Sequence, residues 1–275
     1  MCYDCLLIMT ELSVATWNLN NRVGKVSFRP EAAEAAIALD VDLLVFTEFF
    51  PKEHEKSFTT TLANAGWSEQ RMSEEAPSKD ANRVLIASRS GLQLDPMPLD
   101  FPTFDLPLVD EQLRSKIASE FRSNIASVSL PGLSIIGVRV PWYKGKEAHF
   151  IVPAWEWLEK TTTSLKSSPV IVIGDMNVET TGKCSRGGDH FRRILDNNGW
   201  HRAEPGGPTF FGKRRASELD HILATNHCSL SDLVIVKKKQ GFLFAGSSNN
   251  ISDHAALVCR VELSSHKDVN QPARH

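Results

Sequence analysis

The most informative segment of the chain is VIVIGDMN, residues 170–177. Its four β-branched residues predict a strand buried on both faces, as found in the middle of a sheet. Gly174 allows the backbone to turn tightly where this strand ends. Asp175 and Asn177 follow at the carboxyl edge, where α/β folds place their ligands. Because a carboxylate and an amide need polar partners at such a buried position, this edge is predicted to hold a metal ion, a phosphate or a polar network.

Polar side chains occur at five predicted strand ends: Asn18 with Asn20, Glu48, Asp175 with Asn177, Asp220 with His221, and Asp253 with His254. Taken singly, an Asp or Asn at a strand end usually forms a turn, and a lone Glu is usually solvated. Taken together, they can meet at one edge of a sheet or of a pair of sheets. Oxygen ligands with no cysteine and little histidine suit Mg²⁺ or Mn²⁺ rather than zinc. A histidine beside carboxylates suits chemistry on a phosphate.

Predicted strands and helices alternate along the chain, and hairpins are frequent, which indicates an α/β protein with mixed sheets and outer helices. The predicted helices cover residues 30–39, 56–65, 151–165 and 190–197. The predicted strands cover residues 13–17, 43–47, 67–72, 82–88, 124–130, 134–140, 170–173, 219–224, 233–238 and 255–261. Because there is no repeat and no break in composition, we expect one domain over residues 10–263, with tails at 1–9 and 264–275.

The composition argues against several classes of protein. A hydrophobic fraction of 41% is enough for a core, and a formal net charge of −2 gives no global positive field toward nucleic acid. An anionic substrate would therefore meet a local basic patch. Five cysteines form no dense disulfide framework, which suits a reducing compartment. Because no apolar run approaches the ~20 residues of a membrane span and no signal peptide is evident, we expect a cytoplasmic monomer without a membrane partner.

Five short blocks of the sequence contain the polar strand ends. They are TWNLN at residues 16–20, FTE at 46–48, GDMN at 174–177, LDHIL at 219–223 and SDHA at 252–255. In content and order they resemble the endonuclease/exonuclease/phosphatase superfamily, which includes exonuclease III, the pancreatic DNases, inositol polyphosphate 5-phosphatases and sphingomyelinases. The combination of GDxN with a later SDH is more specific than WNxN alone. The resemblance implies a four-layer α/β/β/α sandwich of two mixed sheets flanked by helices, with the site at one edge of the sheets.

The resemblance also implies a metal site. Glu48 is expected to be the main ligand of Mg²⁺ (or Mn²⁺), and Asn20 is expected to lie near the metal. Asp253 is similar to the acid that lies near both the metal and the histidine in this family. The metal would neutralise charge that grows on the phosphate oxygens.

The remaining matching residues resemble the family's catalytic groups. Asn18 and Asn177 resemble the amides that hold phosphate oxygens and the attacking water, and Asp175 resembles the base that orients or deprotonates that water. His254 resembles the histidine on the phosphate oxygen, and Asp220 the carboxylate that fixes its tautomer. The chemistry implied is an in-line attack of the activated water on phosphorus.

Two positions depart from the family's pattern. Family nucleases carry a tyrosine just before the Val/Phe-Pro end of one strand, and the phosphatases often carry a histidine nearby, whereas this chain has Arg139. An arginine can bind a phosphate oxygen with two donors, so we keep Arg139 as a candidate site residue; the alternative is a structural ion pair. Tyr143 is a poorer candidate for the missing hydroxyl. Glu218 stands before Leu219 where a basic residue is usual, which leaves the substrate class open.

The function predicted from the sequence is that of a Mg²⁺-dependent phosphodiesterase, a nuclease acting on DNA or RNA, because the chain is close in size to the minimal catalytic domain. Basic residues at 213–215 and 237–239, together with Lys183 and Arg186, could follow a nucleic-acid backbone, or could be solvated loops. Phe210 lies in a segment that resembles the loop that family nucleases place against DNA. Trp142 could stack on a base.

Two alternatives stay open from the sequence. One is a phosphomonoesterase, or a hydrolase of phospholipids or inositol phosphates, on the same scaffold. The other is a catalytically silent binding protein that keeps the fold. The joint presence of so many polar groups at strand ends argues against the silent protein, because such a cluster is costly to a fold that has no use for it.

Overall fold

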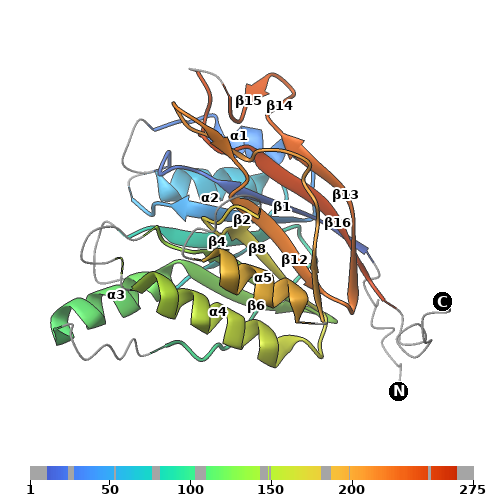
Figure 1. Cartoon of the computed structure of the whole chain (residues 1–275). Coiled ribbons are helices and arrows are strands. Elements are labelled where there is room, and N and C mark those ends of the chain that lie inside the picture. Colours follow the sequence, from blue (N-terminus) through green and yellow to red (C-terminus); the bar gives the residue numbers. More distant parts are fainter. Residues whose placement is uncertain are drawn as a thin grey trace.

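The computed structural model of the chain describes residues 11–23, 28–52, 54–75, 81–102, 110–142, 148, 150–180, 187–197, 199–246 and 249–264. Two sheets pack face to face, as Figure 1 shows, and helices cover the outer face of each. Tyr143, Lys183 and Arg186 lie outside the described residues, so the predictions made for them are not tested. No helix in the described part of the chain is long and apolar enough to cross a membrane.

The first sheet carries the amino-terminal strand in its middle. Its strand order is β13 (Cys228–Val236), β16 (Ala256–Leu263), β1 (Glu11–Asn18), β2 (Leu43–Phe49), β4 (Arg83–Ser88) and β3 (Glu69–Met72). Strands β1 and β2 are parallel and the other pairs are antiparallel, so the sheet is mixed. Its outer face is covered by α1 (Ala32–Ile37) and α2 (Glu55–Asn64).

The second sheet carries the predicted buried strand in its middle. Its strand order is β5 (Asp95–Pro96), β6 (Ile125–Leu130), β7 (Leu133–Arg139), β8 (Val170–Asp175), β12 (Asp220–Thr225) and β9 (Trp200–Arg202). Only β7 and β8 are parallel among these described strands. Its helices are α3 (Glu111–Ser123), α4 (Ile151–Leu165) and α5 (Gly188–Asp196). Two small hairpins pair β10 (Phe210–Phe211) with β11 (Ala216–Ser217), and β14 (Lys238–Lys239) with β15 (Phe242–Leu243).

Three apolar cores separate the four layers. Strand β8 contributes side chains to two of these cores, because successive side chains of a strand point to opposite faces of the sheet. Ile171 and Ile173 pack between the two sheets, whereas Val170 and Val172 pack under the helices of the second sheet. In the first sheet, Trp17 faces the core beneath α1 and α2. The α/β/β/α sandwich of two mixed sheets is thereby confirmed.

Gly174 has a more specific role than the tight turn expected from the sequence. Its φ is +145°, and a Cβ atom built there would lie 2.0 Å from the carbonyl oxygen of Val138 on the neighbouring strand. Any side chain at this position would therefore push β7 away from β8. The residue permits the close approach that places Arg139 beside Asp175, its register partner.

Helix α3 is the main element that the sequence analysis did not predict. Asp110 caps it, because its carboxylate accepts a hydrogen bond from the backbone N–H of Leu113 at 2.8 Å. Ile117 and Phe121, one turn apart, are buried against the second sheet's core. The four predicted helices are present, with boundaries that differ by a few residues.

Candidate active site

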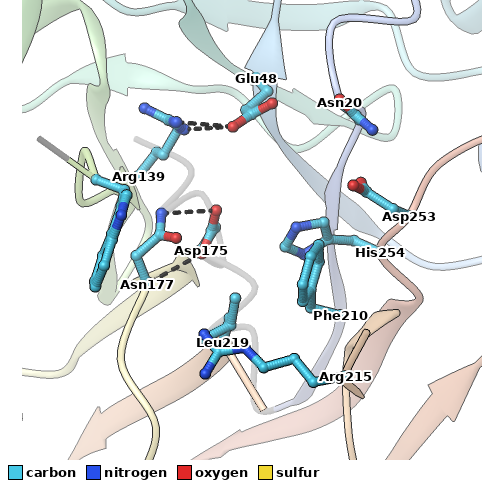
Figure 2. Close-up of a pocket in the computed structure, with 11 residues that line it drawn as sticks. Asn20, Glu48, Arg139, Asp175, Asn177, Phe210, Arg215, Leu219, Asp253 and His254 are labelled. Carbon is cyan, nitrogen blue, oxygen red and sulfur yellow. Dashed lines mark hydrogen bonds and ion pairs between the residues drawn. The ribbon is translucent and has the colours of Figure 1, made fainter. Parts of the chain in front are cut away.

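The polar strand ends meet in one pocket of about 290 Å³ at a shared edge of the two sheets, drawn in Figure 2. The pocket is lined by Asn20, Glu48, Arg139, Trp142, Asp175, Asn177, Phe210, Arg215, Leu219, Asp253 and His254. All the predicted site residues are in this lining except Asn18 and Asp220. Those two are buried behind it and hydrogen-bond to lining residues. The structure therefore brings the candidate site residues together, whereas His221, the polar neighbour of Asp220, is buried outside the lining with Nε2 2.8 Å from the carbonyl of Val178.

Asp175 lies in the middle of this set and accepts three hydrogen bonds. Nδ2 of Asn18 donates to Oδ2 at 2.8 Å, and Nδ2 of Asn177 donates to the same oxygen at 3.1 Å. The backbone N–H of Asn177 donates to Oδ1 at 3.0 Å, closing a turn in which Asn177 takes a φ of +50°. Both amides hold the carboxylate in one orientation.

The pKa of Asp175 is raised to about 7. Burial is the largest cause, and the nearby carboxylate of Asp220 adds to it, whereas the positive charges of His254 and Arg139 act in the opposite direction. The amide donors also favour the ionised form. A carboxylate with a pKa near neutrality is suited to accept a proton at physiological pH.

His254 and Asp220 form a buried pair. Nδ1 of His254 lies 2.7 Å from Oδ2 of Asp220, and the two side chains are 7% and 1% exposed. Burial alone would lower the pKa of His254, but the charges of Asp220, Asp175 and Asp253 raise it to about 10. The imidazole is therefore cationic at neutral pH, with Nδ1 held by Asp220 and Nε2 left for the pocket.

Three residues that the sequence analysis did not assign to the site hold this pair in place. Nε1 of Trp17 donates to the carbonyl oxygen of His254 at 2.9 Å. Oγ of Ser252 accepts from the backbone N–H of His254 at 3.1 Å and donates to the carbonyl of Asn18 at 2.7 Å. Oγ1 of Thr209 accepts from the backbone N–H groups of Leu219 and Asp220, each at 3.0 Å. The hydroxyl two residues before His254 was a visible signal, since Ser commonly bonds to a nearby backbone N–H.

Arg139 pairs with Glu48 across the top of the pocket in Figure 2. Its Nε and Nη2 both lie 2.8 Å from Oε1 of Glu48, and the side chains are 16% and 15% exposed. Glu48 sits at a φ of +50°, where the pairing of β2 with β4 is irregular. A non-glycine residue in this region is held there by its surroundings and often serves a functional site. The ion pair expected as one alternative is present, and it lies inside the site.

The donors at the other side of the pocket suit a hard cation. Among the described residues no group of three or more His, Cys, Asp and Glu side chains could hold a metal. Asn20, Glu48 and Asp253 nevertheless face the same space, and Oδ1 of Asp253 is buried without a hydrogen-bond partner in the described part of the chain. Burial raises the pKa of Asp253. Two carboxylates and an amide fit Mg²⁺, which keeps several waters, and do not fit zinc.

Aromatic and basic side chains form the rim. The ring of Phe210 lies 5.0 Å from that of His254, and Trp142 is 50% exposed beside the pocket. Arg215 lines the pocket from the β10–β11 hairpin and lies 3.4 Å from Oε1 of Glu179. Lys237 stands over the ring of Phe211 at 5.4 Å. Among the described basic residues at 213–215 and 237–239, Arg215 lines the pocket, whereas Lys239 donates to the carbonyl of Leu39 away from it.

Comparison with known proteins gives a family match. A model of the Endonuclease/Exonuclease/phosphatase family matches residues 15–254. No curated protein sequence matches the chain.

Several solved structures share the fold. A 3'-5' exonuclease (NExo) from Neisseria meningitidis is 16% identical, with 90% of this chain and 98% of that chain covered and a TM-score of 0.65. A Neisseria 3' phosphatase NExo bound to a product DNA hairpin is 18% identical, with coverage of 92% and 100% and a TM-score of 0.65. An AP endonuclease from Archaeoglobus fulgidus is 20% identical, with coverage of 90% and 98% and a TM-score of 0.63. At these identities the likeness concerns the fold.

Proposed function

The chain belongs to the endonuclease/exonuclease/phosphatase family, whose members hydrolyse phosphoric esters, and we propose that it is a Mg²⁺-dependent phosphodiesterase that cleaves DNA or RNA. One observation carries the proposal. The carboxylate of Asp175, held by two amides, and the imidazole of His254, held by Asp220, line the same pocket. The pKa of the first is raised to about 7 and that of the second to about 10, which makes them a base and a cation at neutral pH.

Asp175 is proposed to bind the attacking water and take its proton. Asn18 and Asn177 fix the carboxylate in one orientation, so the water is held in one direction toward the phosphorus. Because Asp175 is buried, its basicity is raised without exposing it to bulk water.

His254 is proposed to stabilise the charge that grows on the phosphate oxygens. Its positive charge is fixed by Asp220, and the pair is held by buried hydrogen bonds, so little reorganisation is needed during the reaction. Glu48, Asn20 and Asp253 would hold the divalent cation, on which enzymes of this family generally depend. Bound there, Mg²⁺ would act as a Lewis acid toward a phosphate oxygen.

Nucleic acid is the proposed substrate because of the rim. The molecule carries a net charge of −2, so an anionic polymer must be attracted locally. Lys213, Arg214 and Arg215 lie exposed on the β10–β11 hairpin next to the pocket. Trp142 and Phe210 present aromatic surface on which a base could stack. The structural likeness to an exonuclease and an AP endonuclease agrees with this choice.

A second candidate is a phosphomonoesterase acting on the end of a nucleic acid. It is favoured by the likeness to a Neisseria 3' phosphatase bound to a product DNA hairpin. The Arg139 guanidinium also adds a cation at the pocket wall, where a terminal phosphate would carry its extra negative oxygen.

The test uses the purified full chain with Mg²⁺ and a panel of substrates. The panel contains an end-labelled DNA duplex, the same duplex with a 3'-phosphate, an RNA of equal length, a short-chain phosphoinositide and bis-p-nitrophenyl phosphate. Asp175→Asn serves as the matched inactive control. Shortened strands support the nuclease, and release of inorganic phosphate from the 3'-phosphate duplex alone supports the second candidate. Turnover of the phosphoinositide alone, or no turnover above the Asp175→Asn control on any substrate, contradicts both.

A further inference from the structure

The pair between Arg139 and Glu48 joins the two sheets at the pocket wall. Arg139 is the last residue of β7 in the second sheet, and Glu48 lies in β2 of the first. The arginine uses Nε and Nη2, both at 2.8 Å, on one oxygen, Oε1. The other oxygen, Oε2, lies 3.3 Å from Nδ2 of Asn21. Both contacts of the guanidinium therefore go to Oε1, as the two dashed lines in Figure 2 show, whereas Oε2 contacts the amide of Asn21.

The guanidinium is held from its own sheet as well. The backbone N–H of Arg139 donates to the carbonyl of Asn124 at 2.9 Å, and Nη1 lies 3.4 Å from Oδ1 of the same residue. Nδ2 of Asn124 in turn donates to the carbonyl of Glu120 in α3 at 2.6 Å. Because both members of the ion pair are mostly buried, solvent and salt screen their charges little. Arg139 is therefore a fixed positive charge directly beside Glu48.

We propose that Arg139 is a positioning residue that sets the affinity of the site for its divalent cation. It holds Glu48 by Oε1, presents Oε2 to the cation, and competes with the cation for the same carboxylate charge. The inference rests on the proposed function, which places the cation at Glu48, Asn20 and Asp253. Its physical consequence is a site that binds Mg²⁺ weakly on its own and firmly once the negative charge of the substrate phosphate arrives. The two ligands then bind with positive and reciprocal coupling.

The test is a calorimetric titration of Mg²⁺ into the purified full chain without substrate. Arg139→Gln removes the competing charge and is expected to bind Mg²⁺ about ten-fold more tightly than the wild type, while its turnover falls. Arg139→Lys keeps the competing positive charge, so its affinity for Mg²⁺ should stay closer to that of the wild type than the affinity of Arg139→Gln does. Arg193→Gln breaks an ion pair between Arg193 of α5 and Glu159 of α4, neither of which lines the pocket, and should leave the affinity unchanged.

Glu48→Gln separates the failure of this inference from the failure of the proposed function. If the wild type binds Mg²⁺ no better than Glu48→Gln does, the proposed metal site is wrong and the inference is lost with it. If Mg²⁺ binding depends on Glu48 but Arg139→Gln binds it equally or more weakly, only the inference is overturned.

A second measurement keeps the inference testable should Arg139→Gln fail to fold. The arginine Nε–H signal of Arg139 can be identified by nitrogen-15 NMR from its absence in Arg139→Lys. In the wild type this signal should shift over the Mg²⁺ concentrations at which the calorimetric binding occurs, because the cation and the guanidinium share one carboxylate. A signal that stays in place while Mg²⁺ binds would overturn the inference.

Discussion

Asp175 and Asp220 are direct cross-strand partners on β8 and β12, and both are buried. Like charges in such a position repel each other across the pair of strands. The imidazole of His254, hydrogen-bonded to Asp220 at 2.7 Å, supplies the compensating positive charge. The repulsion contributes to the raised pKa of Asp175, after burial as the main cause. The fold therefore keeps an unfavourable interaction at Asp175, the residue that is proposed to act as the base.

The first prediction concerns Asp220→Asn. The variant removes the carboxylate that raises the pKa of His254 while the burial that lowers it remains. We expect the pKa of His254 to fall, as measured by NMR titration of the imidazole, and turnover to fall by about 100-fold or more because the cation is lost. Asp40→Asn, an exposed control, should change neither. An unchanged pKa of His254 would contradict the pairing.

The second prediction is a trade of stability for activity at Asp175. Because the pKa of Asp175 is raised from 3.8 to about 7, ionisation costs the folded state free energy that accumulates as the pH rises between these values. At pH 8 the change from 3.8 to about 7 is worth up to about 4 kcal/mol, and the hydrogen bonds that Asn makes less well offset part of this, so we expect Asp175→Asn to be more stable than the wild type by about 1–3 kcal/mol, with the difference lost near pH 4. Urea unfolding at the two pH values measures this. Turnover of the variant should fall at least about 100-fold. A variant that keeps its activity, or that is less stable than the wild type at pH 8, would contradict the proposed role of Asp175 as a buried base.

The third prediction concerns His221, which is buried with Nε2 2.8 Å from the carbonyl of Val178. Burial lowers the pKa of His221 from 6.5 to about 4. Between these values the unfolded chain binds a proton that the folded chain does not, so stability falls as the pH falls. We expect this residue to account for about 2 kcal/mol of lost stability between pH 7 and pH 5. The measurement is the difference in unfolding free energy between the wild type and His221→Gln in urea at each pH. Parallel pH curves for the two proteins would contradict this role of His221.

The fourth prediction is the effect of metal removal. Treatment with EDTA should lower turnover by about 100-fold or more, and added Mg²⁺ should restore it, because the proposed site at Glu48, Asn20 and Asp253 loses its Lewis acid. Mg²⁺ should also raise the thermal unfolding midpoint of the wild type, since it binds the folded chain alone. Full activity in EDTA would remove the metal from the proposed reaction.

The fifth prediction tests the rim. In the inactive Asp175→Asn background, Lys213→Gln and Arg214→Gln should each weaken DNA binding and reduce the slope of log K against log salt by about 1, because each loses one phosphate contact. Lys116→Gln, on the exposed face of α3, is the control and should leave the slope unchanged. Equal slopes in all variants would show that the β10–β11 hairpin does not follow a nucleic-acid backbone.

Most strands of the fold could be predicted from the sequence because they have strong local patterns, and the family resemblance supplied their arrangement in two packed sheets. The run at residues 170–173 is buried on both faces, as its β-branched composition indicated, and it divides its side chains between two cores. Helix α3 was not predicted, although Asp110 and the one-turn spacing of Ile117 and Phe121 provided a cap and a buried face. Its mostly polar sequence gave only these weak signals.

The site residues were also accessible from the sequence, through polar groups that follow apolar strands and through family-like blocks. The residues that hold these side chains in place could not be identified from the sequence. Thr209, Ser252 and Trp17 each position the Asp220–His254 pair through a hydrogen bond to its backbone. Buried Ser, Thr and Trp residues commonly make such bonds, so the sequence does not single these three out. The sequence likewise left Arg139 open between a phosphate ligand and an ion pair, and the structure shows the ion pair with Glu48.

The sequence by itself determined most of the strands, the helices outside the sheets and the polar side chains at the strand ends, because neighbouring residues carry the pattern of burial and strand periodicity, and the four layers followed from the family resemblance. Tertiary structure decided which of those groups touch: Asn18 reaches Asp175 across 157 residues, and Arg139 reaches Glu48 across 91. Such contacts depend on strand register and on how two separate sheets pack, and no local pattern encodes either.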